Sequence, residues 1–271
     1  MQTPNSAAGP IITLTTDFGL QDYYVSAMKA VMLGISPSSR FIDISHDVPP
    51  HDVMAAAWIL NNSAFLFPER TVHLTVVDPG VGTTRRPVAL KVNNQFFVGP
   101  DNGLFTLVTQ DYDYEAVELT NKDYWATTRT SSTFHGRDIF APVAAHLAED
   151  GDLHKLGEPI DELYKYKWAI PVADRDGVQG WIIHIDHYGN LITNIGEQLI
   201  KDHIGDGNYN IYVGNTKIRE IVDTFASVSQ GEPAAYIGSS GMLEIAINKG
   251  NAKQMLDIEK GSPINIVLNQ S

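Results

Sequence analysis

Short segments rich in β-branched residues alternate with segments of helical periodicity along the first 77 residues of the chain. The β-branched segments predict strands at 11–16, 41–44 and 71–77, and the segments between them predict helices at 22–34 and 52–60. A strand–helix–strand–helix–strand run is typical of α/β domains, in which helices cover the faces of a mostly parallel sheet. No other feature of the sequence restricts the fold as strongly.

Acidic and polar residues follow these strands where each strand is expected to end. Asp17 and Phe18 follow the first strand, His51 lies in the loop after the second, and Asp78 follows the third. In open α/β sheets, ligands bind outside the carboxyl ends of the strands. The sequence therefore predicts a ligand site at this edge of the sheet.

Two separate loops carry the residues with the clearest chemical character. The loop VDPGVGTTRRP (77–87) places Asp78 before a tight Pro-Gly turn and Arg85 after it, and STFHGRDIFAP (132–142) contains His135. Our hypothesis is that these three side chains meet at one reaction centre. The alternative is structural: the first loop is an ordinary turn, Arg85 lies on the surface, and the histidine is a capping or core residue.

The remainder of the chain changes character after a predicted helix at 138–150, for which Asp138 is the expected cap. Before this helix, an Asn-Asn pair predicts a hairpin within 87–98. After the helix, a polar segment at 155–176 that is interrupted by prolines is typical of a linker. Short strands dominate beyond the linker, which favours a smaller β-rich or barrel domain. These strands are predicted at 179–185, 191–193, 208–213, 216–222, 234–237, 242–247 and 263–268.

The composition excludes several classes of function. The net charge of −13 argues against nucleic-acid binding, which requires a basic surface. The chain has no cysteine, so disulfides, thiolate nucleophiles and cysteine-based metal sites are excluded. No stretch approaches the roughly 20 apolar residues that span a bilayer, and the first ten residues do not resemble a secretory signal. We expect a cytoplasmic protein with neither nucleic-acid nor membrane partners.

Six fragments, taken in order, resemble the S-adenosyl-L-methionine hydroxide adenosyltransferase family. They read TTDFG followed by Tyr24-Val25, DISHDVPPHDV, FPERTVHLTVVDPGVGTTRRP, STFHGRD, DHYGNLITN and SSGMLEIA. Enzymes of this family are S-adenosyl-L-methionine (SAM) hydrolases that form adenosine, and they are related to fluorinating and chlorinating enzymes. The resemblance implies an N-terminal α/β domain (1–165), a C-terminal β-barrel-like domain (176–271), and a homotrimer with substrate between neighbouring subunits. It implies SAM as substrate and no cofactor or metal.

The resemblance also assigns roles to individual residues. It implies that Asp78, Arg85 and His135 form the family's catalytic triad and that Asp17 holds the ribose hydroxyls. In the second domain, the residues that match groups around the methionine moiety are Asp186, Tyr188, Asn190, Ser239 and Ser240. On their own, these second-domain loops are more typical of hairpin turns.

Differences from the halogenating relatives favour water over halide as the nucleophile. Those enzymes carry an aromatic residue where Asp78 stands, and the fluorinating ones carry tyrosine and serine where this chain has His135 and Gly136. His51 replaces an aromatic residue near their pocket. A halide-using enzyme nevertheless remains a competing hypothesis.

The residues alone are also compatible with two further classes of protein. The first is a metallohydrolase, because Asp17, His46, Asp47, His51, Asp78 and His135 are ligand-type residues near strand ends. The second is a non-catalytic protein that senses SAM or adenosine.

Overall fold

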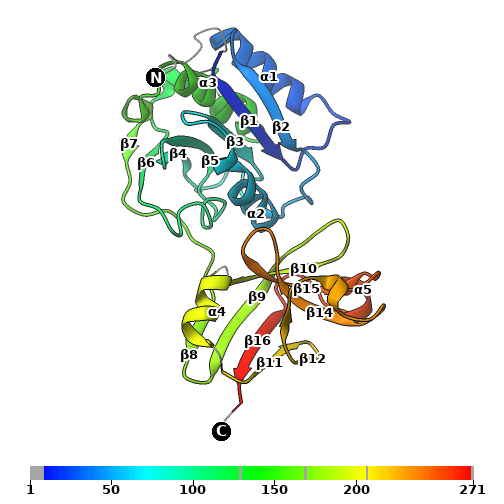
Figure 1. The fold of residues 1–271 in the computed structure, drawn as a ribbon. Coiled ribbons are helices and arrows are strands. Elements are labelled where there is room, and N and C mark those ends of the chain that lie inside the picture. Colours follow the sequence, from blue (N-terminus) through cyan, green and yellow to red (C-terminus); the bar gives the residue numbers. More distant parts are fainter. Residues whose placement is uncertain (1–8, 128–129, 168–169, 206, 270–271) are drawn as a thin grey trace, which may run out of the picture. The chain divides into compact units, whose positions relative to one another are not determined.

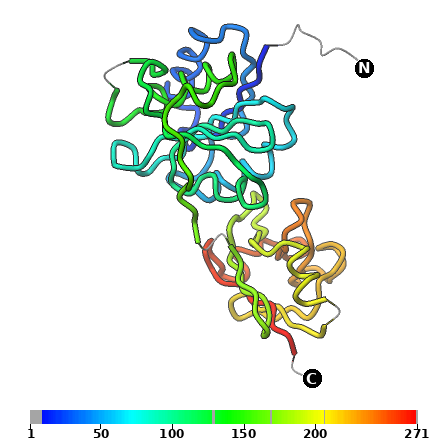
Figure 2. Tube along the Cα trace, turned by 90° about the vertical axis from the view of Figure 1, so that its left-hand side faces the viewer, coloured from blue at the N-terminus to red at the C-terminus, as the bar shows by residue number. Residues whose placement is uncertain are grey.

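The computed structural model describes residues 9–127, 130–167, 170–205 and 207–269. The chain divides into two compact units, Met1–Lys165 and Tyr166–Ser271, which occupy the blue-to-green and the yellow-green-to-red parts of the trace in Figure 2. The first is an α/β unit and the second is a β-rich unit, which confirms the predicted fold class. Every helix in the described part of the chain is too short or too polar to traverse a lipid bilayer.

Seven strands form the sheet of the first unit in the order β2-β1-β3-β5-β4-β6-β7 among the described residues (Figure 1). Their bounds are β1 (Ile11–Thr16), β2 (Arg40–Ser45), β3 (Val72–Val76), β4 (Pro87–Val92), β5 (Gln95–Pro100), β6 (Tyr114–Glu118) and β7 (Glu158–Pro159). The pairs β1–β2, β1–β3 and β3–β5 are parallel. The pairs β4–β5, β4–β6 and β6–β7 are antiparallel.

The sheet is therefore mixed, and the prediction of a mostly parallel sheet was too strong. The predicted hairpin of β4 and β5 is confirmed, with Asn93 and Asn94 at φ 45° and 61° in its turn. Such left-handed turns join adjacent antiparallel strands. In this hairpin, β5 runs back along β4, and β6 and β7 add further antiparallel pairs on the far side of β4.

Helices pack on the parallel part of this sheet. They are α1 (Tyr24–Ile35), α2 (Val53–Ser63) and α3 (Ala141–Asp150). Alternate strand residues point to opposite faces, and Leu14, Leu74 and Val98 pack with α1 and α3 in the main core. On the other face, the rings of Phe65 and His73 contact Phe97. The short turn that follows α2, Ala64–Leu66, therefore covers that side of the sheet.

The entry to α3 differs from the expectation. A π-helical turn, Gly136–Phe140, runs directly into α3, and Gly151 ends the helix at φ 67°. Asp138 is not a helix cap, because it lies buried within the π turn and bonds to Arg137 and to the backbone of Ser131. A π turn inside a helix is frequently found at functional sites.

The second unit is a nearly closed sheet. Its strand order in the described residues is β12-β11-β16-β9-β10-β15-β14-β13, with β8 on β9, and β12 approaches β14 near the other end. The bounds are β8 (Val172–Asp174), β9 (Gly177–Ile185), β10 (Leu191–Gly196), β11 (Tyr209–Val213), β12 (Thr216–Ile218), β13 (Ile221–Val222), β14 (Pro233–Ile237), β15 (Met242–Ile247) and β16 (Pro263–Leu268). Two short helices were not predicted, α4 (Glu197–His203) and α5 (Ala252–Leu256).

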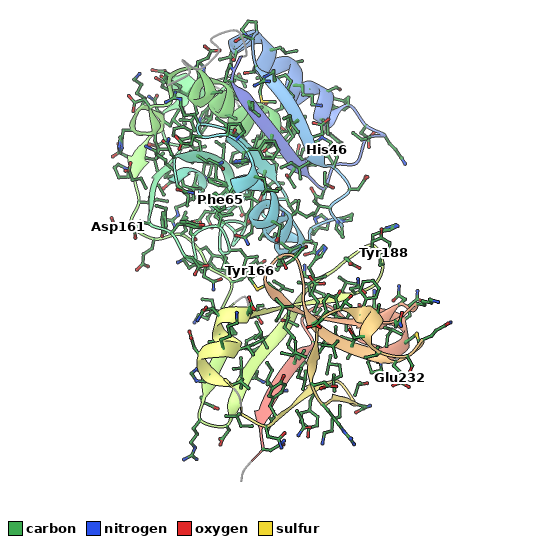
Figure 3. All side chains as sticks on the ribbon, in the orientation of Figure 1. His46, Phe65, Asp161, Tyr166, Tyr188 and Glu232 are labelled. Carbon is green, nitrogen blue, oxygen red and sulfur yellow. The ribbon has the colours of Figure 1, made fainter. Side chains whose placement is uncertain are left out.

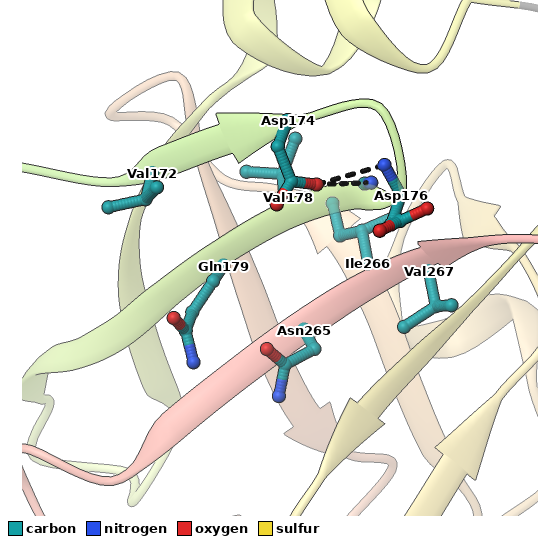
Figure 4. A pocket seen from close by; sticks show the side chains of 9 residues that line it. Val172, Asp174, Asp176, Val178, Gln179, Asn265, Ile266 and Val267 are labelled. Carbon is teal, nitrogen blue, oxygen red and sulfur yellow. Dashed lines mark hydrogen bonds between the residues drawn. The ribbon is translucent and has the colours of Figure 1, made fainter.

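A shallow hollow of about 220 Å³ lies over β8, β9 and β16 (Figure 4). Its carboxylate Asp174 accepts hydrogen bonds from the backbone of Asp176 and Gly177, at 2.9 and 3.2 Å. None of the candidate site residues lines it. This carboxylate therefore serves the β8–β9 turn.

Candidate active site

A cavity of about 280 Å³ opens at the carboxyl ends of β1 and β3 in the first unit. We call it the strand-end cavity. Six of the seven first-unit candidates line it, namely Asp17, Phe18, His51, Asp78, His135 and Gly136. The seventh, Arg85, contacts two of these residues. The structure thus brings the first-unit candidates together at the predicted edge of the sheet.

Asp78, Arg85 and His135 form one hydrogen-bonded cluster. Arg85 Nε lies 3.0 Å from each carboxylate oxygen of Asp78, and Arg85 Nη2 lies 2.5 Å from Oδ2. The same Nη2 lies 2.7 Å from His135 Nδ1. The side chains of the ion pair are 5% (Asp78) and 9% (Arg85) exposed. Desolvation of this kind strengthens the attraction between paired charges.

These contacts determine which nitrogen of His135 carries the proton. A guanidinium only donates hydrogen bonds, so Nδ1 must accept from Arg85 and Nε2 carries the hydrogen of the neutral ring. Burial and the neighbouring Arg85 charge lower the pKa of His135 below its ordinary value. The ring is therefore neutral at pH 7, and its Nε2–H is the donor left for a ligand.

The two loops of the cluster touch at Gly82. This residue has φ 75°, and a Cβ placed there would overlap the carbonyl oxygen of Ser132. Glycine is the residue that allows both the left-handed backbone and the close approach. The Arg85 guanidinium also lies over the ring of Phe140, 5.2 Å from its centroid. The loop after β3 is thus held against the loop that carries His135.

Asp138 restrains the loop that carries His135. Its buried carboxylate accepts a hydrogen bond from Ser131 N at 2.7 Å through Oδ2 and from Arg137 Nε at 2.6 Å through Oδ1. Because Ser131 precedes His135 and Arg137 follows it, a carboxylate bonded in this way holds the chain on both sides of the imidazole.

Asp17 is tied to the loop that follows β2. His51 N donates to Asp17 Oδ2 at 2.9 Å, with His51 itself at φ 67°. In the same loop, the buried ring of His46 lies 2.8 Å from Thr16 Oγ1 through Nδ1 and 3.2 Å from Asp43 Oδ1 through Nε2. Asp17 is therefore held in place while its carboxylate keeps lone pairs for a ligand.

A larger cavity, of about 630 Å³, lies in the second unit. Asp186, Tyr188, Asn190 and Ser239 line it, whereas Ser240 does not, and the Ser240 hydroxyl is buried without a hydrogen-bond partner in the described structure. Asp186 Oδ1 accepts from the backbone of Tyr188 and Asn190, at 2.9 and 2.8 Å, and Oδ2 accepts from the Asn190 amide at 2.8 Å. Tyr188 projects from its loop into solvent (Figure 3).

Several residues of the second-unit cavity were not predicted, among them Tyr236 and Glu244. Tyr236 donates its hydroxyl to Glu244 Oε2 at 2.9 Å, and a Cβ on Gly238 would overlap the Glu244 carboxylate. Burial first, and then the Asp186 charge, raise the pKa of Glu244. Burial and Glu244 raise the pKa of Tyr236. Glu244 lies within the SSGMLEIA fragment, so its charge in an otherwise apolar strand was the available signal.

The first unit also contains site residues that the sequence did not indicate. Tyr24, Thr133 and Phe134 line the strand-end cavity beside the predicted residues. No group of three or more His, Asp or Glu side chains in the described ranges is arranged to hold a metal ion. The ligand-type residues near the strand ends instead bond to one another and to backbone groups.

Comparisons with known proteins match nearly the whole chain. A family model for the SAM hydroxide adenosyltransferase N-terminal domain matches residues 12–157, and one for the C-terminal domain matches residues 180–265. The chain is 38% identical to an (R)-S-adenosyl-L-methionine hydrolase of Thermus thermophilus, over 93% of this chain and 97% of that protein. It is 36% identical to an enzyme of the same name from Salinispora tropica, over 96% and 98%.

A fluorinase and a solved crystal structure also match the chain. A fluorinase of Nocardia brasiliensis is 30% identical, over 97% of this chain and 99% of that protein. The crystal structure of an uncharacterized conserved protein from Thermotoga maritima superposes with a TM-score of 0.84 at 38% identity, over 94% of this chain and 99% of that one.

Proposed function

The chain belongs to the SAM hydroxide adenosyltransferase family, and from this premise we propose that it hydrolyses SAM to adenosine and L-methionine. Its relatives are named for the R epimer at sulfur, and we assign the same epimer to this enzyme. The observation that carries the proposal is the Asp78–Arg85–His135 cluster, which borders the same cavity as Asp17.

The reaction is a displacement at C5′ of the substrate. The oxygen of a water molecule forms a bond to C5′, the C5′–S bond breaks, and its electron pair stays on sulfur. Methionine leaves as a neutral thioether, so no general acid is needed. The water must lose a proton, and the site must place it in line with the breaking bond. Such positioning can lower the activation barrier by roughly 7 kcal/mol or more.

The hydrogen bonds of the cluster divide this task between its members. His135 Nδ1 accepts from Arg85, so the Nε2–H of the neutral ring orients the water by donating to its oxygen. Asp78 lines the cavity and is the base that faces it. Arg85 holds both partners and stabilises the carboxylate charge. The neutral imidazole therefore positions the water, and Asp78 accepts the proton.

Asp17 binds the ribose of the substrate. Two vicinal ribose hydroxyls can donate to a single carboxylate with charge-assisted strength. Asp17 keeps lone pairs for this after its bond to His51 N. The ribose is thereby held with C5′ toward Asp78 and His135.

Isotope transfer tests the reaction directly. The purified protein is incubated with the R epimer of SAM in ¹⁸O-labelled water, and the adenosine and methionine formed are analysed by mass spectrometry. We expect one labelled oxygen in each adenosine, at the 5′ position, and none in methionine. Unlabelled adenosine, or binding of SAM without any adenosine, would refute the proposal. A 5′-halogenated nucleoside formed in chloride or fluoride would identify a halogenase instead.

We further propose a homotrimer in which the second-unit cavity of one subunit completes the strand-end cavity of its neighbour. Asp186 would then meet the substrate ammonium, with Tyr188, Asn190 and the serine loop beside it. The exposure of Tyr188 supports a role at such a contact.

Subunit mixing tests this assembly. His135→Ala and Asp186→Ala are each expected to be inactive alone, because each lacks one half of every site. Refolded together in equal amounts, they are expected to recover about one quarter of wild-type activity, since random assembly rebuilds that share of the shared sites. Recovery of no activity, from variants that do assemble into mixed trimers, would place each site within a single chain.

A further inference from the structure

A buried histidine, His46, follows β2 in the first unit (Figure 3) and contacts the end of β1. Its side chain is 2% exposed, and its Nδ1 atom lies 2.8 Å from Oγ1 of Thr16, the last residue of β1. The pairing of β1 with β2 ends one step earlier, where Thr15 pairs with Ser45. The loop residue His46 therefore holds β1 at the point where strand pairing stops, directly before Asp17.

The chain around Asp17 is bonded to His46 and to its partner Thr16. Phe18 N donates to Thr16 Oγ1 at 3.3 Å, and Gly19 N donates to the carbonyl oxygen of His46 at 2.8 Å. A hydroxyl group carries one hydrogen, so Thr16 can accept from Phe18 and still donate to His46. These bonds lie on both sides of Asp17 and fix the backbone from which its carboxylate projects.

The opposite edge of the His46 ring faces a carboxylate. Nε2 lies 3.2 Å from Asp43 Oδ1, without the alignment of a hydrogen bond. Lys29 of α1 pairs with Oδ2 of the same carboxylate at 2.6 Å. A carboxylate in this position favours the tautomer with its hydrogen on Nε2. Nδ1 is then the acceptor for the Thr16 hydroxyl.

We propose that His46 is a positioning residue for ribose recognition, which acts by holding Thr16 and thereby the Asp17 carboxylate. The inference rests on the proposed function, which places the ribose at Asp17. His46 does not line the strand-end cavity, so it acts through Asp17 and not by touching the substrate.

The bonding of Asp17 explains why it needs this support. Its side-chain hydrogen bond in the described residues comes from His51 N and reaches only Oδ2. A carboxylate that accepts from two vicinal hydroxyls must present its oxygens at a defined angle. The direction of Oδ1 is therefore set by the backbone, and this is the part of the chain that His46 and Thr16 hold.

Binding of adenosine and of 2′-deoxyadenosine tests the inference, because the second nucleoside lacks one hydroxyl that Asp17 would bind. Dissociation constants are measured by calorimetry for the wild type, His46→Leu and Thr16→Val. We expect the wild type to prefer adenosine by about 10- to 100-fold, the scale of a hydrogen bond to a charged group. In both variants the preference should fall below about threefold. His46→Asn keeps a polar atom near the position of Nδ1 and should retain most of the preference.

His73 and Thr13 provide matched controls. His73 is also buried in the first unit, and its Nδ1 also lies 2.8 Å from a threonine hydroxyl of β1, that of Thr13. Neither residue lines the strand-end cavity. His73→Leu and Thr13→Val should lower the melting temperature and leave the preference for adenosine unchanged.

A folded His46→Leu or Thr16→Val protein with the wild-type preference would overturn the inference. Equal weakening for both nucleosides counts as this outcome, because it would mark His46 as a structural residue only. If His46→Leu does not fold, Thr16→Val decides the question, since it keeps the shape of the side chain. A wild type without preference would show that Asp17 does not bind the ribose, and the inference would fall with that assignment. The isotope experiment would still decide the reaction separately.

Discussion

Replacing His135 by alanine is expected to lower kcat by about 10³-fold while KM for SAM stays within about threefold. A positioned acid–base or water-binding side chain contributes typically about 10²–10⁴ in rate. Alanine removes the Nε2–H that orients the water and leaves Arg85 Nη2 without its imidazole acceptor. The ribose is held by Asp17, which this change does not alter. Initial rates at saturating SAM, with adenosine quantified by chromatography, measure the effect.

His146→Ala is the control for this variant. His146 is also half-buried in the first unit, burial also lowers its pKa, and its ring packs on Tyr124 rather than on the cavity. Its kcat should remain within about twofold of wild type. If His135→Ala were folded and kept kcat within a few-fold of wild type, the imidazole could not be positioning the nucleophile.

The pH profile of the wild type reports on the same ring. Because burial and Arg85 lower the pKa of His135, the neutral ring should persist from pH 7 down past 6.5. At lower pH a proton on Nδ1 would remove the acceptor for Arg85, and kcat should fall. The unfolded chain takes up this proton first, so the contribution of His135 to stability is also lost as the pH falls from 6.5 through the lowered pKa.

The strands and helices of the first unit were largely predictable because each has a strong local pattern. The β-branched segment β1 and the Asn93–Asn94 hairpin turn follow from local sterics alone. Strand direction across the sheet is a long-range property. The predicted hairpin already required one antiparallel pair of strands. The strand β6 was overlooked because only Ala116 and Val117 of its five residues are buried.

The helices α4 and α5 of the second unit were overlooked because they span seven and five residues, which is too few to show helical periodicity.

The site was predictable to the extent that chemistry determines residue type. A carboxylate, a guanidinium and an imidazole at loop positions indicated a cluster, and the structure brings them into contact. The tautomer of His135 depends on which atom Arg85 reaches, and no sequence pattern contains that information. Tyr24 and Phe134 were overlooked as site residues because they come together at the cavity only when the chain has folded.

Gly82→Ala is expected to lower kcat by at least about 10²-fold although it removes no functional group. Alanine at φ 75° is strained by about 1–2 kcal/mol, and its methyl group would overlap the carbonyl oxygen of Ser132. The loop that carries Asp78 and Arg85 must then move away from the loop that carries His135. A displacement of about 1 Å at reacting groups can cost about 10²-fold in rate. Rates are measured well below the melting temperature, so that the variant remains folded.

Gly261→Ala separates backbone strain from loop separation. Gly261 has φ 83°, and a Cβ there would meet no atom within 4 Å, so alanine brings comparable strain without an overlap. The melting temperature should fall in both variants, whereas kcat should fall only in Gly82→Ala. A folded Gly82→Ala enzyme with near wild-type kcat would show that the contact between the two loops does not hold the cluster together. The alignment of Asp78, Arg85 and His135 would then have to come from their own hydrogen bonds.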